Sequence, residues 1–315
     1  MHRIFILRAF GDFVIFLNSI LRSSNKQQYK IIVSAHLQPL YDALRNDINT
    51  QGLHIEFVNF QIEKGQLRLF TNKHFLSSNT IKEINSIQSY IKQNPNNTGI
   101  DYIEQNKRVG LLNLLSQHKF QPIVFDKEVY LSYDHFFENE TFDQQVSSNK
   151  SLHQSTNNKN ESGDIVIFPD SRLAKKDIPA NVLEDITTYF QTRNISYKIA
   201  SFEKQQIRAY KNSSETKRVV ENNVNVNDND NDNDIESEHK VQYHNFETLI
   251  QIIKSAHVVI GADSLPVHLA AILQIPHYIF YNEHLGRYFI TPYAKNNNSF
   301  GTFSNYETLL HKALS

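Results

Sequence analysis

The chain has 315 residues, of which 40% are hydrophobic and 21% charged, which is enough apolar mass for two domains of ordinary size. It contains no cysteine, which excludes a disulfide framework, a thiolate metal site and a cysteine nucleophile, and suits a reducing compartment. The formal net charge of -1 argues against a nucleic-acid-binding protein, because such a protein needs a basic surface to displace counterions from phosphates.

The first half of the chain alternates apolar, β-rich runs with segments whose apolar residues recur every three or four positions. This rhythm predicts a parallel sheet covered by helices on both faces. We expect strands at 3–7, 30–34, 55–60 and 122–125, and helices at 12–22, 37–46, 81–92 and 109–118. Because Arg8 and Asp12 interrupt the apolar start of the chain, we expect a buried strand and a helix there rather than a signal peptide or a membrane span.

Two polar segments interrupt this pattern. Residues 144–162 are almost wholly polar, so they predict a linker between an N-terminal domain, 1–143, and a C-terminal domain, 163–315. Residues 212–240 contain Asn alternating with Val and then with Asp, which predicts a disordered surface insertion. Its Asp-x-Asp repeats belong to this low-complexity run and the histidines are scattered, so we expect no metal site.

After the linker the alternation resumes and predicts a second α/β unit. We expect strands at 165–168, 196–200, 258–260 and 277–281, and helices at 179–192, 246–255, 266–273 and 306–313. Right-handed crossovers would make each half one Rossmann-like, doubly wound domain.

The strongest chemical signal follows the apolar strand that ends near Gly261. Segment 262–268, Ala-Asp-Ser-Leu-Pro-Val-His, predicts a turn into a helix capped by Asp263 or Ser264. The N–H groups of such a first turn attract an anion such as a diphosphate, and His268 would face the same crevice. From the residues alone, a plain capped helix with a half-buried histidine is an equal alternative.

Two further turns follow predicted strands. The polar segment 169–179 contains Ser171, Arg172 and Lys176 and leads to a helix started by Pro, although a solvated lysine pair before a helix is the alternative. At the end of the first strand, Gly11 permits a tight turn and Asp12 stands at the helix start, where it could face an interdomain cleft or serve only as an N-cap.

Together these turns resemble glycosyltransferase family 9, the heptosyltransferase family. Segment 263–270 is similar to the family signature of Asp, Ser or Thr, Gly, two residues, His, Leu or Ile, and Ala, with Leu265 in place of the usual Gly. The loop with Lys176 is similar to the family loop whose lysine contacts the donor diphosphate, and Ser171 or Arg172 falls near its hydroxyl position. The family also carries a Gly-Asp where this chain has Gly11-Asp12, and a Pro-Tyr like that of 292–293.

The resemblance implies a GT-B fold, with two Rossmann-like domains facing a central cleft, the acceptor on the first and the nucleotide sugar on the second. It implies an inverting, metal-independent glycosyltransferase in which Asp12 is the general base and Lys176 stabilises the departing diphosphate. The implied donor-binding residues are Ser171, Arg172, Asp263, Ser264, Leu265 and His268, with Gly11 forming the backbone turn.

The implied donor is an ADP-linked sugar, typically ADP-heptose, with no separate cofactor, and the implied acceptor is the lipopolysaccharide core or another glycan, glycolipid or protein. We expect a cytoplasmic location with peripheral contact at the inner face of the membrane. Leu265 and the short loop before Asp12 motivate one alternative, an inactive relative that acts as a binding or assembly subunit. A second alternative is a nucleotide-sugar epimerase of the same fold.

Overall fold

The computed structural model describes residues 1–7, 9–60, 78–104, 109–125, 128–137, 163–171, 176–202, 239–283 and 288–306. The predicted linker and Arg172 lie outside these ranges. So do all but residues 239–240 of the predicted insertion and all but Tyr306 of the predicted last helix.

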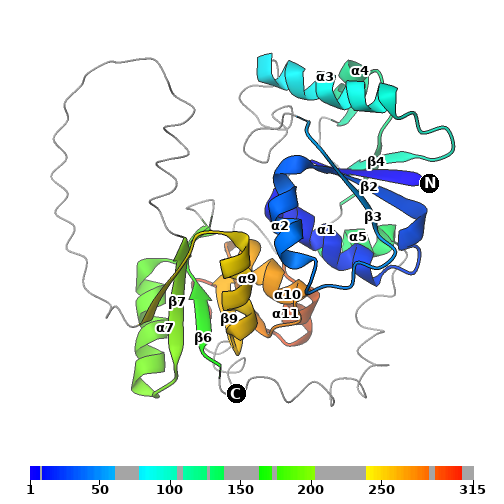
Figure 1. Ribbon diagram of the computed structural model, residues 1–315. Helices are drawn as coiled ribbons and strands as arrows, with labels where there is room; N and C mark the ends of the chain where they lie inside the picture. Colours follow the sequence, from blue (N-terminus) through cyan, green and yellow to red (C-terminus); the bar gives the residue numbers. More distant parts are fainter. Residues whose placement is uncertain are drawn as a thin grey trace, which may run out of the picture.

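Each half of the described chain forms one sheet with its helices (Figure 1). The first half contains β1 (His2–Ile6), α1 (Phe10–Arg22), η1 (Lys26–Gln28), β2 (Tyr29–Ser34), η2 (Ala35–Leu37), α2 (Gln38–Leu44), β3 (His54–Val58), α3 (Ser78–Gln93), β4 (Asp101–Glu104), α4 (Val109–Ser116), β5 (Gln121–Ile123) and α5 (Val129–Phe136). The second contains β6 (Ile165–Phe168), α7 (Ala180–Thr192), β7 (Tyr197–Phe202), β8 (Lys240–Tyr243), α9 (Phe246–Ser255), β9 (Val258–Ala262), α10 (Leu265–Ile272), β10 (His277–Tyr281), α11 (Pro292–Asn296) and β11 (Phe300–Thr302).

Both sheets are doubly wound. All neighbouring named strands in the described ranges run parallel, in the orders β3-β2-β1-β4-β5 and β11-β10-β9-β6-β7-β8. In each sheet the chain winds outward from the first strand in one direction and then returns to wind outward in the other, which is the Rossmann order. The predicted fold class of two Rossmann-like units is confirmed, while the domain boundaries stay predictions.

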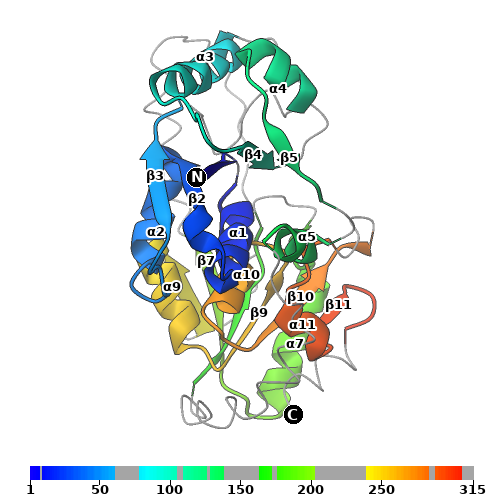
Figure 2. The same ribbon diagram turned by 90° about the vertical axis from the view of Figure 1, so that its right-hand side faces the viewer.

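The alternation of side chains along the strands explains the layers. Ile4 and Ile6 of β1 face a core shared with α1, α2 and α5, whereas Phe5 and Leu7 face α3 and α4 on the other side. The first core continues into the second half, where α9 and α10 add their apolar faces. Figure 2 shows α1, α2 and α5 next to α9 and α10 between the sheets, with α3 and α4 at one end and α7 at the other. The two halves therefore meet through an apolar helical layer.

Among the strands and α-helices, the sequence prediction missed β4, α5, β8, α11 and β11. β4 and β8 have four residues each, α11 has five and β11 has three, so none of these four is long enough to give a clear period. The predicted insertion, 212–240, extends one residue too far, because Lys240 is the first residue of β8 and pairs with Ile199. Strand 55–60 ends early, at Val58, and strand 122–125 shrinks to β5, where Pro122 is tolerated because β5 is an edge strand.

None of the helices in the described ranges combines the length and apolarity required to cross a bilayer. The apolar α1 has 13 residues, fewer than the roughly 20 that a span requires.

Candidate functional site

The predicted donor-binding turns follow two adjacent strands in the middle of the second sheet. β6 pairs with β9, and the chain winds away from this pair in opposite directions. Ser171 and Lys176 follow β6, and Asp263 and Ser264 follow β9. Open α/β sheets bind ligands outside the carboxyl ends of their strands at such a reversal, so both turns lie where the topology favours a ligand.

Lys176 and Asp263 form an ion pair across these two turns. The Lys176 ammonium is 2.6 Å from Asp263 Oδ2 and also donates to the Asp263 carbonyl oxygen at 3.2 Å. It lies 5.2 Å from the centre of the Phe289 ring, so an aromatic face forms another side of its environment. Residues 87 positions apart in the sequence are thus brought into contact.

His268 holds the second oxygen of the same carboxylate. Its Nε2 lies 3.3 Å from Asp263 Oδ1, and its Nδ1 lies 3.0 Å from the hydroxyl oxygen of Tyr130. The imidazole is only 3% exposed, so it is buried rather than half-buried. Burial raises the pKa of Asp263, but the hydrogen bond and attraction of His268 and the ammonium of Lys176 outweigh it. The pKa of this carboxyl therefore lies below its ordinary value, and the group is ionised at neutral pH.

The start of α10 differs from its prediction. Ser264 occupies the N-cap position with extended backbone, but its side chain does not cap; the hydroxyl donates to the Ala262 carbonyl at 3.2 Å instead. The Asp263 carboxylate does not cap either, because Lys176 and His268 hold it. Leu265 is the first helical residue and packs against the apolar core. Neither Ser264 nor Asp263 therefore caps the first turn of α10, which leaves its N–H groups available to an anion.

The first turn of α1 lies against this site. A Cβ on Gly11 would sit 3.7 Å from His268 Cδ2, and α1 runs beside α10. The N-cap of α1 is Ala9, so the alternative that Asp12 is an N-cap is wrong; Asp12 is half-buried in the first turn. The structure thus brings Lys176, Asp263 and His268 together and places Gly11 against them, with Asp12 as the next residue of the same turn.

Ser171 is held within the loop that leads to Lys176. The backbone N–H of Ser171 donates to Asp177 Oδ1 at 2.6 Å, which shapes the loop before Lys176. The roles predicted for Ser171 and Arg172 stay predictions. Within the ranges that the structure describes, no group of three or more His, Asp or Glu side chains could hold a metal ion.

Tyr130 is the site residue that sequence reasoning missed. It lies on α5, whose Val129, Tyr130, Tyr133 and Phe136 recur at helical spacing, and this spacing could have predicted the helix. Its contact with His268 spans 138 residues and has no signal in the local sequence.

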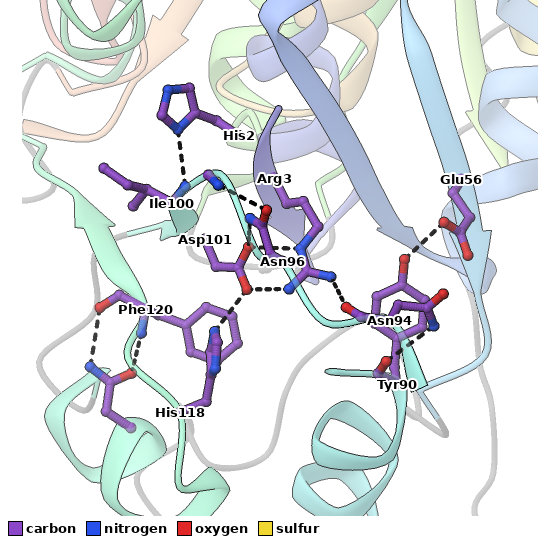
Figure 3. Close-up of polar contacts among 12 residues, drawn as sticks. His2, Arg3, Glu56, Tyr90, Asn94, Asn96, Ile100, Asp101, His118 and Phe120 are labelled. Carbon is purple, nitrogen blue, oxygen red and sulfur yellow. Dashed lines mark hydrogen bonds and ion pairs between the residues drawn. The ribbon is translucent and has the colours of Figure 1, made fainter. Parts of the chain in front are cut away.

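A second polar cluster lies at the opposite, amino edge of the first sheet (Figure 3). Arg3 donates to both oxygens of Asp101, which also contacts Asn96 at 2.7 Å and His118 at 2.8 Å. A hollow of about 440 Å³ lies beside it, lined by Met1, Arg3, Lys30 and 94–98. Since Asp101 pairs with Arg3 and Glu56 pairs with Lys30, both cationic side chains of the hollow are matched, and we assign the cluster a structural role.

Comparison with known proteins identifies the fold. No family model and no curated protein matches the sequence. The E. coli heptosyltransferase WaaC with ADP-2-deoxy-2-fluoro heptose matches with a TM-score of 0.55 and 12% identity, covering 100% of this chain and 99% of that one. A glycosyl transferase family 9 protein from Veillonella parvula DSM 2008 matches with a TM-score of 0.53 and 14% identity, covering 99% and 90%. The protein therefore has a heptosyltransferase-like GT-B fold of two Rossmann-like units.

Proposed function

We propose that the protein is an inverting, metal-independent glycosyltransferase that uses a nucleoside diphosphate sugar. The observation that carries this proposal is the convergence of Lys176, Asp263 and the start of α10 at the strand-order reversal of the second sheet, with Gly11 of the first half against them and Asp12 next to Gly11 in the same turn. A cation beside a helix N-terminus suits a diphosphate, and a carboxylate from the facing half suits an acceptor hydroxyl.

In the proposed step, Asp12 takes the proton of the acceptor hydroxyl as its oxygen attacks the anomeric carbon. The bond from that carbon to the diphosphate oxygen breaks, and the two electrons leave with the diphosphate. Lys176 and the first-turn N–H groups of α10 stabilise the negative charge that develops there. Asp263 holds Lys176 before the donor arrives and is placed to accept hydrogen bonds from sugar hydroxyls.

The proposed donor is an ADP-linked sugar, because the E. coli neighbour was solved with a fluorinated ADP-heptose analogue. The proposed acceptor is a glycan, glycolipid or protein, reached by peripheral contact at the cytoplasmic face of the membrane. Leu265, in place of the family glycine, supports a second candidate: a relative that binds the nucleotide without turnover.

Two measurements test the proposal and separate the candidates. Ligands that bind only the folded protein raise its Tm, so ADP at a hundredfold excess over its Kd should stabilise the chain by about 2.7 kcal/mol, and UDP and GDP serve as comparisons. Release of ADP from ADP-heptose, dependent on added lipopolysaccharide core, then reports turnover. Binding without turnover would favour the second candidate, and no thermal shift with any nucleotide would reject both.

Lys176→Ala supplies the matched variant for this test. Loss of a charge-assisted hydrogen bond to phosphate should weaken ADP binding by about 1.5–3 kcal/mol, or roughly ten- to a hundredfold, measured by calorimetric titration. Lys198→Ala, which breaks the more exposed Lys198–Asp164 pair, should leave the ADP affinity unchanged. Normal ADP affinity in Lys176→Ala would show that the diphosphate binds elsewhere.

A further inference from the structure

Helix α5 is fixed to the second half of the molecule by three consecutive residues at its start. Glu128 pairs with Lys295, the Val129 N–H donates to the Tyr288 carbonyl at 3.0 Å, and Tyr130 contacts His268 at 3.0 Å. The same helix packs against α1, which carries Asp12 in its first turn. α5 therefore joins the helix of the proposed base to the donor site, and Tyr130 is its point of contact with that site.

The direction of the Tyr130 hydrogen bond follows from its surroundings. The side chain is 2% exposed, and burial together with the charge of Asp263 raises the pKa of its phenol far above the ordinary value. The phenol consequently keeps its proton. The buried hydroxyl needs an acceptor for this proton, and His268 Nδ1, 3.0 Å from its oxygen, is placed to be that acceptor.

This direction determines the tautomer of His268. An Nδ1 that accepts from Tyr130 carries no proton, so in the neutral ring the proton is on Nε2. Nε2 faces Asp263 Oδ1 at 3.3 Å and can donate to it. In the other tautomer a lone pair on Nε2 would face the ionised carboxylate, and the two would repel.

We propose that Tyr130 is a positioning residue of the donor site: its hydroxyl holds His268 as the Nε2–H tautomer, and His268 in turn orients the Asp263 carboxylate that holds Lys176. The inference rests on the proposed function, in that the Asp263–Lys176 pair is the part that would meet the donor. These contacts run from α5 to α10 and the turn before it, so they also make the geometry of the donor site depend on the seating of α5 against the second half.

The first test reads the tautomer directly, on ligand-free protein labelled with ¹⁵N-histidine at pH 8. We expect His268, assigned by the signal lost in His268→Gln, to show a protonated Nε2 and an unprotonated Nδ1. In Tyr130→Phe, which removes one oxygen and keeps the ring, the population of the Nδ1–H tautomer should rise measurably, because Asp263 alone then favours the Nε2–H form. Tyr90→Phe is the control, because it deletes a phenol bonded to Glu56 at the far edge of the first sheet (Figure 3).

The second test measures the consequence for binding. Tyr130→Phe should weaken ADP binding by roughly tenfold, as expected for the loss of one buried hydrogen bond and its orienting effect, while Tyr90→Phe should not. His268→Gln can still donate to Asp263 but no longer needs Tyr130, so adding Tyr130→Phe to it should cause no further loss of affinity.

These outcomes separate the inference from the proposed function. A wild-type His268 protonated on Nδ1, a tautomer unchanged in Tyr130→Phe, or an equal loss of affinity in both backgrounds would overturn the role of Tyr130. If wild-type protein failed to bind ADP or any other nucleotide, the proposed function would fail, whereas the tautomer measurement would still decide whether Tyr130 positions His268.

Discussion

The charges of Asp12 and Lys176 are stabilised in different ways by the surrounding chain. Lys176 is held by a carboxylate from a neighbouring turn, so its place is fixed before any ligand binds. Asp12 stands in the first turn of α1, where the N-terminal end of the helix favours its negative charge. Charge placement is thus complementary, with a cation at the donor turns and an anion on the facing helix.

Asp12→Asn should lower kcat by a factor of about 100 or more, because a general base contributes about 10²–10⁴-fold and an amide cannot take a proton. ADP affinity should stay within about twofold, since we propose that the diphosphate binds to the second half. Initial rates and calorimetric titration check the two expectations. Asp42→Asn, at an exposed carboxylate, is the matched control. Full turnover in Asp12→Asn would remove Asp12 from the mechanism.

At the scale of elements, the first sheet depends on a buried ion pair that ties β1 to β4. Burial raises the pKa of Asp101, but the hydrogen bonds of Arg3 and Asn96 and the charges of Arg3 and His118 outweigh it, so the pKa is lowered. Because the pKa of Asp101 is lower in the folded protein than its ordinary value of 3.8, the ionised carboxylate stabilises the fold at pH values above 3.8. This stability is lost as the pH falls from 3.8 through the pKa of the folded protein.

Asp101→Asn should lower the free energy of unfolding by about 3–5 kcal/mol, because it leaves the Arg3 guanidinium buried without its anion. Glu56→Gln, in the more exposed Lys30–Glu56 pair, should cost about 1 kcal/mol or less. Urea unfolding measures both. The folded Asp101→Asn protein should bind ADP normally, and a weakened affinity would show that this edge of the sheet is coupled to the site.

The start of β10 contains a second buried ionisable residue, His277. Its Nδ1–H donates to the Ile275 carbonyl at 2.8 Å, and its Nε2 accepts from the Thr291 hydroxyl at 2.6 Å. Thr291 also caps α11, accepting from the Ala294 N–H at 3.1 Å. The neutral ring thus links β10 to the start of α11, and burial lowers the pKa of His277 to about 4.

Between pH 6.5 and 4, unfolding lets His277 bind a proton that the folded protein excludes, so stability should fall as the pH is lowered. The slope is about 1.4 kcal/mol per pH unit, or about 3 kcal/mol over the interval. His277→Gln should flatten this slope in urea unfolding series, whereas His244→Gln, at an exposed position, should keep it. An unchanged slope in His277→Gln would contradict the neutral, buried state of the ring.

At the scale of the whole molecule, the two halves share an apolar core instead of meeting only through polar surfaces. Residues of α1 and α5 belong to the same buried cluster as residues of α9 and α10, and the Phe10 and Phe246 rings lie 4.9 Å apart across the junction. Opening this layer would expose apolar surface from both halves at once.

We therefore expect calorimetry to show one cooperative transition, with the calorimetric enthalpy equal to the van't Hoff enthalpy. ADP should shift the whole transition, although its proposed site lies on the second half. Two separate transitions, of which ADP shifts only one, would show that the halves unfold independently.

The sequence predicted the elements best where one period runs through a whole segment. β6, α9 and β10 have the predicted bounds, because their apolar residues recur without interruption between polar turns. The prediction failed at β4 and β8, whose few residues become strands only by pairing with neighbours already in place. Such short strands are determined by the neighbouring strands that they pair with more than by a period of their own.

For the site, the sequence by itself determined the three turns and the residue types that they carry, because turn residues act within a few positions of one another. Only the tertiary structure decided which turns meet. The pairing of Lys176 with Asp263 and the contact of Tyr130 with His268 depend on strand order and on helices from both halves. Such contacts join residues far apart in the chain, and they form only when the apolar faces of the helices are buried together.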